Sequence, residues 1–311
     1  MKKPLIVIVG PTAVGKTKLS IEIAKQFNGE VISGDSMQVY RGMDIGTAKV
    51  RSEEMEGIPH HLIDIQEPCE PYTAAEFQRQ VNSSIASIQA AGRLPIIAGG
   101  SGLYIQSVLY GYRFGEQKRD EERTAKLEKE LEELGADVLH TRLKTYNAEK
   151  AEKIHPNNHR RLIRALELYE TKTTSSKSEL MKNLEESSCK PLVIGLEMER
   201  SLLYHRINER VDQMIAAGLI DEVKTLVAKG YQDCQAMNAI GYKELIPFIK
   251  GDMKLDEAIE LLKRNSRRYA KRQYTWFRNK MDVQWHEIRP EHAEKSFSVI
   301  SSEIAGFLSD F

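Results

Sequence analysis

Short apolar runs alternate with helical segments over the first hundred residues. Residues 5–9, 30–33 and 94–98 are rich in β-branched side chains and are bounded by Gly, Pro or Asp, as buried strands usually are. Between these runs, residues 16–27 and 74–91 carry apolar positions at helical spacing. Strands that alternate with helices predict a parallel sheet built from βαβ units.

The pattern changes after about residue 113. Residues 116–133 are charged and contain few strand-forming residues. Helical spacing returns in three short segments, at residues 139–143, 148–154 and 160–169. A further strand is expected at residues 191–196, and most of the chain beyond it has helical character. We therefore predict an all-helical insertion domain over residues 114–190, which interrupts an α/β core formed by residues 1–113 and 191–311.

The first predicted strand leads directly into a sequence that fits G-x-x-x-x-G-K-[S/T]. Its eight residues are Gly10, Pro11, Thr12, Ala13, Val14, Gly15, Lys16 and Thr17. Such a loop turns backbone N–H groups toward an anion, and the following helix adds its N-terminal dipole. Lys16 supplies a point charge, and the Thr17 hydroxyl is suited to Mg²⁺. The segment predicts a di- or triphosphate site on a P-loop NTPase-like parallel sheet flanked by helices, but it leaves open which bond is broken.

A second polar segment follows the second predicted strand. It contains Asp35, Ser36, Met37 and Gln38. In open α/β folds ligands bind at the carboxyl edge of the sheet, so Asp35 is expected near the bound phosphates. There it could orient Mg²⁺ or accept a proton from an attacking group, and a helix N-cap is the structural alternative.

Basic side chains gather in two further segments. In the insertion, Arg160, Arg161 and Arg164 recur at helical spacing and can face one phosphate backbone. Residues 263–280 carry eight Lys or Arg and no acidic residue. Three residues spaced by seven, Leu262, Tyr269 and Trp276, are predicted to form the core face of that helix. In the insertion the spacing alone leaves RNA contact and ordinary solvated surface both open, whereas the density of charge over residues 263–280 favours contact with a phosphate backbone.

Cysteines and histidines predict no metal site. Cys69, Cys189 and Cys234 are scattered without C-x-x-C spacing, so we predict neither a disulfide framework nor a zinc site, which favours a reducing compartment. His60 and His61 are adjacent, so their side chains point in different directions, and no third ligand is suitably spaced. A structural or hydrogen-bonding role is predicted for both.

Charge and hydropathy limit the partners further. Basic and acidic residues balance at 45 each, which excludes a globally basic nucleic-acid coat but allows local basic patches. No run approaches the roughly 20 apolar residues that a membrane span needs. We expect a cytoplasmic monomer without a membrane partner.

An ordered set of motifs resembles the bacterial tRNA dimethylallyltransferases, or tRNA isopentenyltransferases, of the IPP transferase family. The matching segments cover nearly the whole chain and comprise residues 10–17, 35–49, 60–64, 99–104, 154–164 and 270–276. The resemblance implies transfer of a dimethylallyl group from dimethylallyl diphosphate to N6 of the adenine immediately 3′ of the anticodon. It implies tRNAs that read codons beginning with U, recognised through the anticodon stem-loop, with Mg²⁺ as cofactor and diphosphate released.

The resemblance also implies roles for single residues. Asp35, Thr12 and Lys16 would be catalytic, with Asp35 as general base or orienting acceptor for the N6 amine. The donor would bind the loop at residues 10–17 and Arg210, and Thr17 would hold the metal. The tRNA would contact Asp35, Ser36, Met37, Gln38, Ser101, Arg160, Arg161, Leu162, Ile163 and Arg164. For Arg210 the alternative is a salt bridge with Glu209 or Asp212 on its own helix.

Other functions remain open on the residues alone. A small-molecule P-loop kinase explains the loop and Asp35 but leaves the basic segments without a role. An adenylate isopentenyltransferase would use the same donor on a free nucleotide, and a non-catalytic RNA-binding NTPase would alkylate nothing. Phosphorylated product, prenylated nucleotide and prenylated tRNA distinguish these functions.

Overall fold

The computed structural model describes residues 2–112, 121–170 and 189–311. Part of the charged segment predicted at 116–133, its residues 116–120, lies outside this description. Contacts divide the chain into two compact units, Met1–Tyr110 with Glu186–Phe311, and Gly111–Glu185. Each unit is considered by itself.

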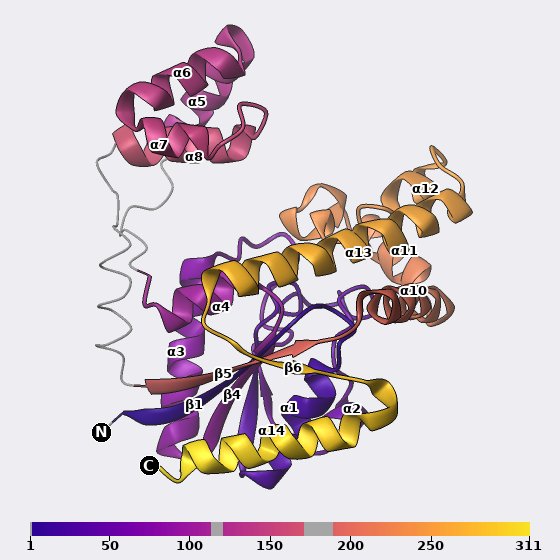
Figure 1. The fold of residues 1–311 in the computed structure, drawn as a ribbon. Helices are drawn as coiled ribbons and strands as arrows, with labels where there is room; N and C mark the ends of the chain where they lie inside the picture. Colours follow the sequence, from indigo (N-terminus) through magenta and orange to yellow (C-terminus); the bar gives the residue numbers. More distant parts are fainter. Residues whose placement is uncertain (1, 113–120, 171–188) are drawn as a thin grey trace. The chain divides into compact units, whose positions relative to one another are not determined.

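The larger unit is built on a parallel sheet, as the alternating pattern predicts. Its six strands are β1 (Lys3–Val9), β2 (Gly29–Ser33), β3 (His60–His61), β4 (Leu94–Gly99), β5 (Cys189–Glu197) and β6 (Gln284–Glu287), in the order β3-β2-β4-β1-β5-β6 (Figure 1). Val9 pairs with Gly99 of β4 and with Gly195 of β5, so three carboxyl ends lie close together. The sequence analysis missed β3, which has two residues, and β6, whose four residues are mostly polar.

Helices cover both faces of this sheet. They are α1 (Lys16–Gln26), α2 (Ser52–Met55), α3 (Ala74–Ala90), α4 (Gly102–Leu109), α10 (Arg200–Ala216), α11 (Leu219–Ala228), α12 (Ile246–Lys250), α13 (Leu255–Lys280) and α14 (Ala293–Leu308), with short 3₁₀ turns at Tyr231–Asp233, Gln235–Asn238 and Pro290–His292. Because side chains alternate along a strand, Val7 joins a core cluster with α3 and α4, whereas Ile6 and Ile8 join one with α1 and α14. Figure 1 shows these helix pairs on opposite faces of the sheet.

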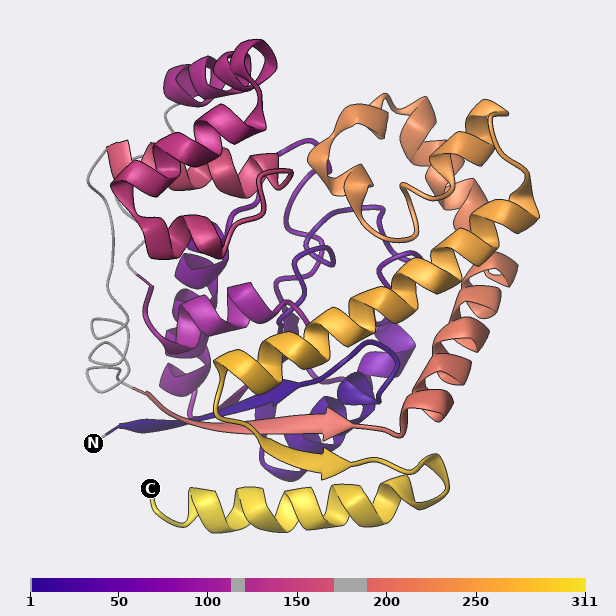
Figure 2. The same ribbon diagram turned by 45° about the horizontal axis from the view of Figure 1, so that its top comes forward.

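Helix α13 passes the carboxyl ends of the central strands, and Figure 2 shows its length clearly. Its buried face differs from the prediction. Leu262 is buried as expected, whereas Tyr269 and Trp276 are only partly buried. The buried positions recur at helical spacing, at Ala258, Leu262, Ser266, Ala270, Gln273 and Phe277. Trp276 still packs against the core cluster that includes α3 and α4, so the predicted stripe lies at the border of the buried face.

Two of the three cysteines overturn the expectation drawn from their spacing. Cys69 and Cys234 form a disulfide, with their Cα atoms 4.8 Å apart and a separation of 165 positions in sequence. Spacing rules detect local pairs, so a bond between distant loops escapes them. The reducing compartment was inferred from the lack of a disulfide, so the cysteines no longer support that inference.

The smaller unit is helical in the part that the structure describes. It contains α5 (Glu121–Leu134), α6 (Ala136–Tyr146), α7 (Ala148–Glu152) and α8 (His159–Glu170). Leu162 and Ile163 of α8 are buried in its core, and the tRNA contact that the resemblance implies for them stays a prediction. The apolar face of α8 must close this small core. Arg160 and Arg161 are exposed, and Arg164 pairs with Glu167 at 2.8 Å.

Across the three described ranges, no helix combines the length and the apolar character that crossing a membrane requires.

Candidate active site

The Gly10–Thr17 loop connects the end of β1 to the start of α1, where the sequence predicts an anion cradle. Gly10 has φ of +147°, and a Cβ at this position would lie 2.6 Å from the carbonyl oxygen of Leu196 on β5. Only glycine fits both restrictions. The loop is tied to α10, because Arg206 Nε donates to the carbonyl of Ala13 at 3.0 Å. These contacts fix the loop between two strands and one helix.

Lys16 is folded against this loop. Its Nζ donates to the carbonyl oxygens of Gly10 at 3.0 Å and Pro11 at 2.7 Å. Burial, and then the charge of Arg210, lower the pKa of Lys16 to about 7, and the charge of Asp35 opposes both effects. An anion that binds here would favour the ammonium form. Lys16 would therefore take up a proton when an anion binds beside it.

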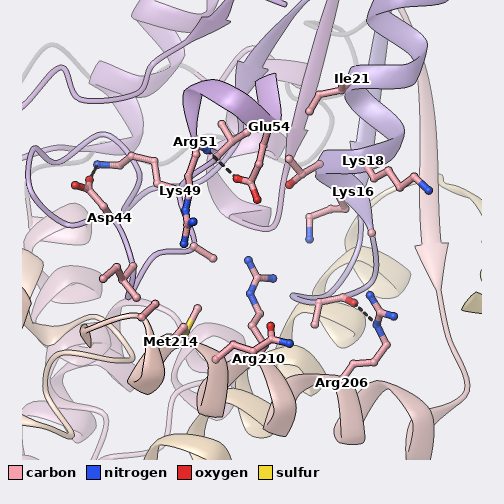
Figure 3. A pocket seen from close by; sticks show the side chains of 18 of the residues that line it. Lys16, Lys18, Ile21, Asp44, Lys49, Arg51, Glu54, Arg206, Arg210 and Met214 are labelled. Atoms are coloured by element: carbon pink, nitrogen blue, oxygen red, sulfur yellow. Dashed lines mark hydrogen bonds and ion pairs between the residues drawn. The ribbon is translucent and has the colours of Figure 1, made fainter. Parts of the chain in front are cut away.

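A cavity of about 620 Å³ opens beside the loop. Its walls come from the loop and α1, from residues 44–56, and from α10 (Figure 3). Basic side chains outnumber acidic ones in its lining, with Lys16, Lys18, Lys49, Arg51, Arg206 and Arg210 against Glu22, Asp44, Glu54 and Glu56. Apolar side chains, Ile21, Ile45, Val50 and Met214 among them, line the same space. A ligand with a compact anionic end and a small apolar part matches this lining.

Arg210 points into the cavity from α10 (Figure 3). It makes no hydrogen bond or ion pair with any residue that the structure describes. The predicted alternative, a salt bridge within its helix, is wrong, because Glu209 pairs with His205 and Asp212 with Lys263. Burial lowers the pKa of Arg210, while the charges of Asp35 and Glu54 oppose this effect. A partly buried guanidinium with open donors is suited to an anionic ligand.

Asp35 follows β2, at the carboxyl edge of the sheet. Its Oδ1 accepts the N–H of Met37 at 2.8 Å, and no helix begins after it, so the helix N-cap alternative is wrong. Burial raises the pKa of Asp35, and this effect is opposed first by the Met37 N–H and then by the charge of Lys16. A carboxylate with a raised pKa beside two cations is a candidate proton acceptor.

Ser101 joins the segment of Asp35 to the start of α4. Its Oγ accepts the backbone N–H of Ser36 at 2.9 Å and lies 3.2 Å from the Ser36 hydroxyl. The side chain of Tyr269 is hydrogen-bonded to Ser101, and burial together with the charge of Asp35 raises the pKa of its phenol. The sequence analysis assigned Tyr269 to the core. This contact joins parts of the chain that are far apart in sequence, so no local pattern reveals it.

Gln38 is engaged within its own segment. Its Oε1 accepts the hydroxyl of Ser33 at 2.8 Å, and its Nε2 lies 3.3 Å from the carbonyl of Thr47. Reading the edge of an adenine would require exchange of these bonds. In this structure the amide holds the chain that follows β2.

Gln273 was not predicted as a site residue. It is buried in α13, where its Oε1 accepts the N–H of Thr12 at 2.9 Å and its Nε2 donates to the carbonyl of Gly100 at 3.1 Å. Through these bonds α13 fastens Thr12, predicted to be catalytic, to the turn after β4. The contact spans 261 residues in sequence, so no local pattern reveals it.

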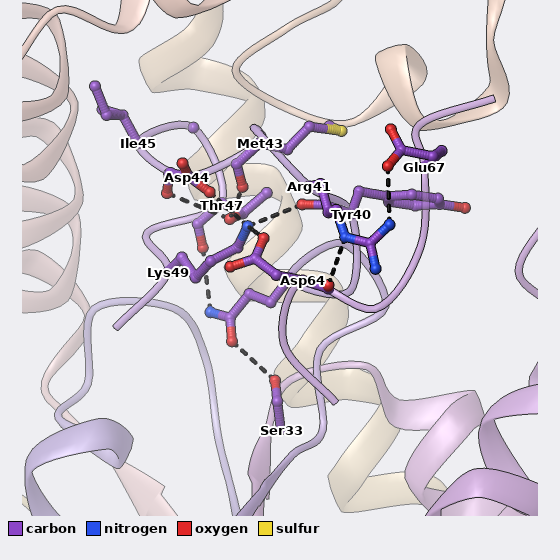
Figure 4. A network of polar contacts seen from close by, with 12 residues as sticks. Ser33, Tyr40, Arg41, Met43, Asp44, Ile45, Thr47, Lys49, Asp64 and Glu67 are labelled. Atoms are coloured by element: carbon purple, nitrogen blue, oxygen red, sulfur yellow. Dashed lines mark hydrogen bonds and ion pairs between the residues drawn. The ribbon is translucent and has the colours of Figure 1, made fainter. Parts of the chain in front are cut away.

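Lys49 organises a polar network beside the cavity (Figure 4). Its Nζ lies 2.8 Å from the carbonyl of Tyr40 and 2.5 Å from carboxylate oxygens of both Asp44 and Asp64. The Lys49 side chain is only 5% exposed, so this network is an internal support of the wall formed by residues 44–51. It leaves Lys49 little capacity to bind a ligand directly.

His60 and His61 have the structural role that the sequence predicts. His61 Nε2 lies 2.5 Å from Glu30 Oε2, and His60 Nδ1 lies 2.9 Å from the carbonyl of Ile58. In the part of the chain that the structure describes, no group of three or more His, Cys, Asp or Glu is arranged to hold a metal ion.

A glycine-rich loop between β1 and α1, at the carboxyl edge of a parallel sheet flanked by helices, defines a P-loop-type α/β protein, and the predicted fold class is confirmed. The chain belongs to the IPP transferase family, whose model, described as "IPP transferase", matches residues 38–280. It is a transferase by this membership, and the resemblance seen in its motifs is confirmed.

Relatives and solved structures agree over nearly the full length. The chain is 55% identical over 310 residues to the tRNA dimethylallyltransferase of Oceanobacillus iheyensis, covering 100% of this chain and 99% of that protein. It is 51% identical over 308 residues to the tRNA dimethylallyltransferase of Bacillus subtilis, covering 99% and 98%. A crystal structure of the full-length tRNA isopentenylpyrophosphate transferase from Bacillus halodurans matches with a TM-score of 0.74 and 50% identity, covering 99% and 98%. A eukaryotic dimethylallyltransferase acting on tRNA matches with a TM-score of 0.79 and 31% identity, covering 98% of this chain and 80% of that one.

Proposed function

We propose that this protein transfers the dimethylallyl group of dimethylallyl diphosphate to N6 of the adenine immediately 3′ of the anticodon, in tRNAs that read codons beginning with U. The observation that carries the proposal is the buried position of Asp35 at the carboxyl edge of the sheet, where the charges of both Lys16 and Arg210 act on its carboxylate. A proton acceptor therefore borders an anion site, as transfer from a diphosphate to an amine requires. The full-length similarity to tRNA dimethylallyltransferases supports the choice of substrates.

The donor half of the site suits the departure of diphosphate. In the reaction the C1–O bond of the donor breaks, and its electron pair stays on the diphosphate oxygen. Lys16, Arg210 and the backbone N–H groups of the loop would stabilise this charge as it develops. Ile45 and Met214 line the same cavity and offer apolar contact to a five-carbon chain. No γ-phosphate takes part.

The acceptor half centres on Asp35. The N6 lone pair forms the new N–C bond, and the proton that N6 loses passes to the Asp35 carboxylate. The burial that raises the pKa of Asp35 makes it a stronger base than an exposed aspartate. An adenine must leave its stack to reach such a site, and extraction of a loop base costs less than extraction from a duplex.

Thr17 fits the expected Mg²⁺. Its side chain is exposed at the cavity beside Lys16, and its hydroxyl makes no hydrogen bond with a described residue. A hydroxyl oxygen is the kind of hard ligand that Mg²⁺ prefers. Thr17 would hold the ion, which when bound supplies positive charge to the diphosphate oxygens.

Further contacts with tRNA are proposed for the exposed arginines Arg160 and Arg161, for Ser36 and Ser101 near Asp35, and for the basic side of α13. Since tRNA is the proposed acceptor, we propose the cytoplasm as the place of action. Action as a monomer stays a prediction.

The test is incubation with dimethylallyl diphosphate, Mg²⁺ and unmodified tRNA, followed by mass analysis of the digested nucleosides. The expected product is a single adenosine heavier by one dimethylallyl group in place of one hydrogen. Parallel reactions with AMP as acceptor and with ATP as donor test the adenylate isopentenyltransferase and the kinase. Prenylated AMP with unmodified tRNA, or phosphorylated product with no prenyl transfer, would refute the proposal.

A further inference from the structure

We propose that Glu222 is a positioning residue for the donor site. It lies in the first turn of α11 and does not line the cavity. Its carboxylate instead holds the backbone of residues 44–46, which begin one wall of that cavity. The identity of the donor rests on the proposed function, whereas the binding of diphosphate to the cavity does not.

Three consecutive backbone N–H groups converge on the Glu222 carboxylate. Oε2 accepts from Ile45 at 2.7 Å and from Asp44 at 3.1 Å, and Oε1 accepts from Gly46 at 3.1 Å. Oε1 also accepts the hydroxyl of Tyr242 at 2.7 Å. Both oxygens are therefore used, and bonds from N–H to carboxylate are stronger than those between neutral groups.

Among the described residues, the N–H groups of Asp44 and Ile45 have no hydrogen-bond partner other than Glu222, whereas the N–H of Gly46 also faces the Tyr242 hydroxyl. The carbonyls of Asp44 and Ile45 accept from Lys49 and Ala48, each at 2.9 Å, so the turn satisfies its own acceptors. The N–H groups at its beginning face outward, as at the start of a helix. Glu222 caps them from a helix that lies 176 residues away in sequence.

Tyr242 completes the attachment from the other side. Its side chain is fully buried, and a Cβ on Gly46 would lie 2.6 Å from the Tyr242 ring, so the ring rests directly on the backbone of Gly46. Burial, and then the charge of Glu222, raise the pKa of Tyr242. The phenol therefore stays a hydrogen-bond donor at every physiological pH, and the clamp of Glu222 and Tyr242 does not titrate through the phenol.

The clamp bears on the cavity through the chain it holds. Asp44, Ile45 and then residues 48–51 line the cavity opposite Arg210 and Met214. Lys49 stabilises the middle of this wall through its ion pairs with Asp44 and Asp64 (Figure 4). Glu222 stabilises the start of the wall, at residues 44–46. Loss of the carboxylate would leave the N–H groups of Asp44 and Ile45 to find other partners, and the wall beside the donor would move.

The experiment compares E222Q and Y242F with the wild-type chain. The KM for dimethylallyl diphosphate is measured at saturating tRNA, the Kd of inorganic diphosphate by calorimetry, and the Kd of tRNA by filter binding. E222Q should raise both donor-side constants by about tenfold or more, and Y242F by roughly threefold, with the tRNA constant within about twofold of wild type. D221N is the matched control, since Asp221 is the exposed neighbour on α11 and should change none of the three constants.

Wild-type donor-side constants in both variants would overturn the inference. A parallel rise of donor and tRNA constants that follows a loss of folded protein in thermal unfolding would also overturn it, because it would indicate a purely structural role. If E222Q does not fold, Y242F decides on the same criterion, since it removes one hydroxyl and keeps the ring on Gly46. If the wild-type chain prenylates no tRNA, the proposed function fails, and the diphosphate affinities of the variants still decide the role of Glu222.

Discussion

Binding of the donor should be coupled to the protonation of Lys16. In the free protein, burial and then the charge of Arg210 lower the pKa of Lys16 from 10.5 to about 7, although the charge of Asp35 opposes them. A diphosphate in the cavity reverses the balance, because its negative charge stabilises the ammonium form. The protein is therefore expected to take up a proton when it binds dimethylallyl diphosphate above pH 7.

The magnitude follows from the pKa. With a pKa of about 7, roughly one tenth of Lys16 is protonated in the free protein at pH 8, so binding takes up about 0.9 proton. At pH 6 roughly nine tenths is already protonated, and uptake falls to about 0.1 proton. The same shift affects stability. The pKa of Lys16 is lower in the folded state than in the unfolded state, so the unfolded chain binds more protons between the two values, and the free protein gains stability as pH rises from about 7 to 10.5.

The assay is titration calorimetry without tRNA, at pH 6 and pH 8, in pairs of buffers that differ in ionisation enthalpy. The slope of apparent enthalpy against buffer enthalpy gives the number of protons exchanged for each donor bound. K16R is the control, because a guanidinium stays charged at both values of pH and takes up no proton. Two results would refute both the lowered pKa of Lys16 and its place beside the diphosphate. One is a wild-type proton uptake at pH 8 that does not exceed the uptake by K16R. The other is a wild-type proton uptake at pH 8 that does not exceed the uptake at pH 6.

Three further perturbations address other parts of the site. Asp35→Ala should lower turnover about 10²-fold or more with tRNA retention unchanged, and wild-type turnover would remove Asp35 from the reaction. Gln273→Leu leaves the two backbone groups that it bridges unpaired, so the free energy of unfolding in urea should fall by about 2–4 kcal/mol, against no change in the exposed Thr275→Ala; equal stability of the two variants would contradict the clamp. Joint replacement of Arg160 and Arg161 by Ala should reduce the slope of log Kd for tRNA against log salt by about 1–2, and an unchanged slope would exclude them from phosphate contact.

The parts of the site that sequence predicts are those whose residues are contiguous. The loop at residues 10–17 carries its chemistry in eight consecutive positions, and Asp35 follows a strand that periodicity reveals. Arg210 required the family resemblance, because one arginine on an amphipathic helix has no distinctive spacing. Gln273 and Glu222 act across 261 and 176 residues, and such contacts exist only once the sheet has brought the loops together.

Errors in the sequence analysis have the same origin. The strand β6 forms because Gln284–Glu287 pairs with the edge of β5, although most of its residues are polar and their pattern does not indicate a strand. Tyr269 has the spacing of a core position on α13, yet its side chain is only partly buried and is hydrogen-bonded to Ser101. In both cases tertiary contacts outweigh the local pattern.

Helix α13 sets the distance between the two halves of the proposed reaction. Gln273 holds the N–H of Thr12 on the donor side, and one turn earlier Tyr269 is bonded to Ser101 on the side of Asp35. Residues four apart lie on one face of a helix, so a shift of α13 would displace both contacts together. Part of its positive charge is already committed, since Lys263 pairs with Asp212 and Arg278 with Glu197. The basic residues left for RNA are therefore attached to the same rigid element that aligns donor and acceptor, and binding of tRNA along α13 would act on the geometry of the transfer itself.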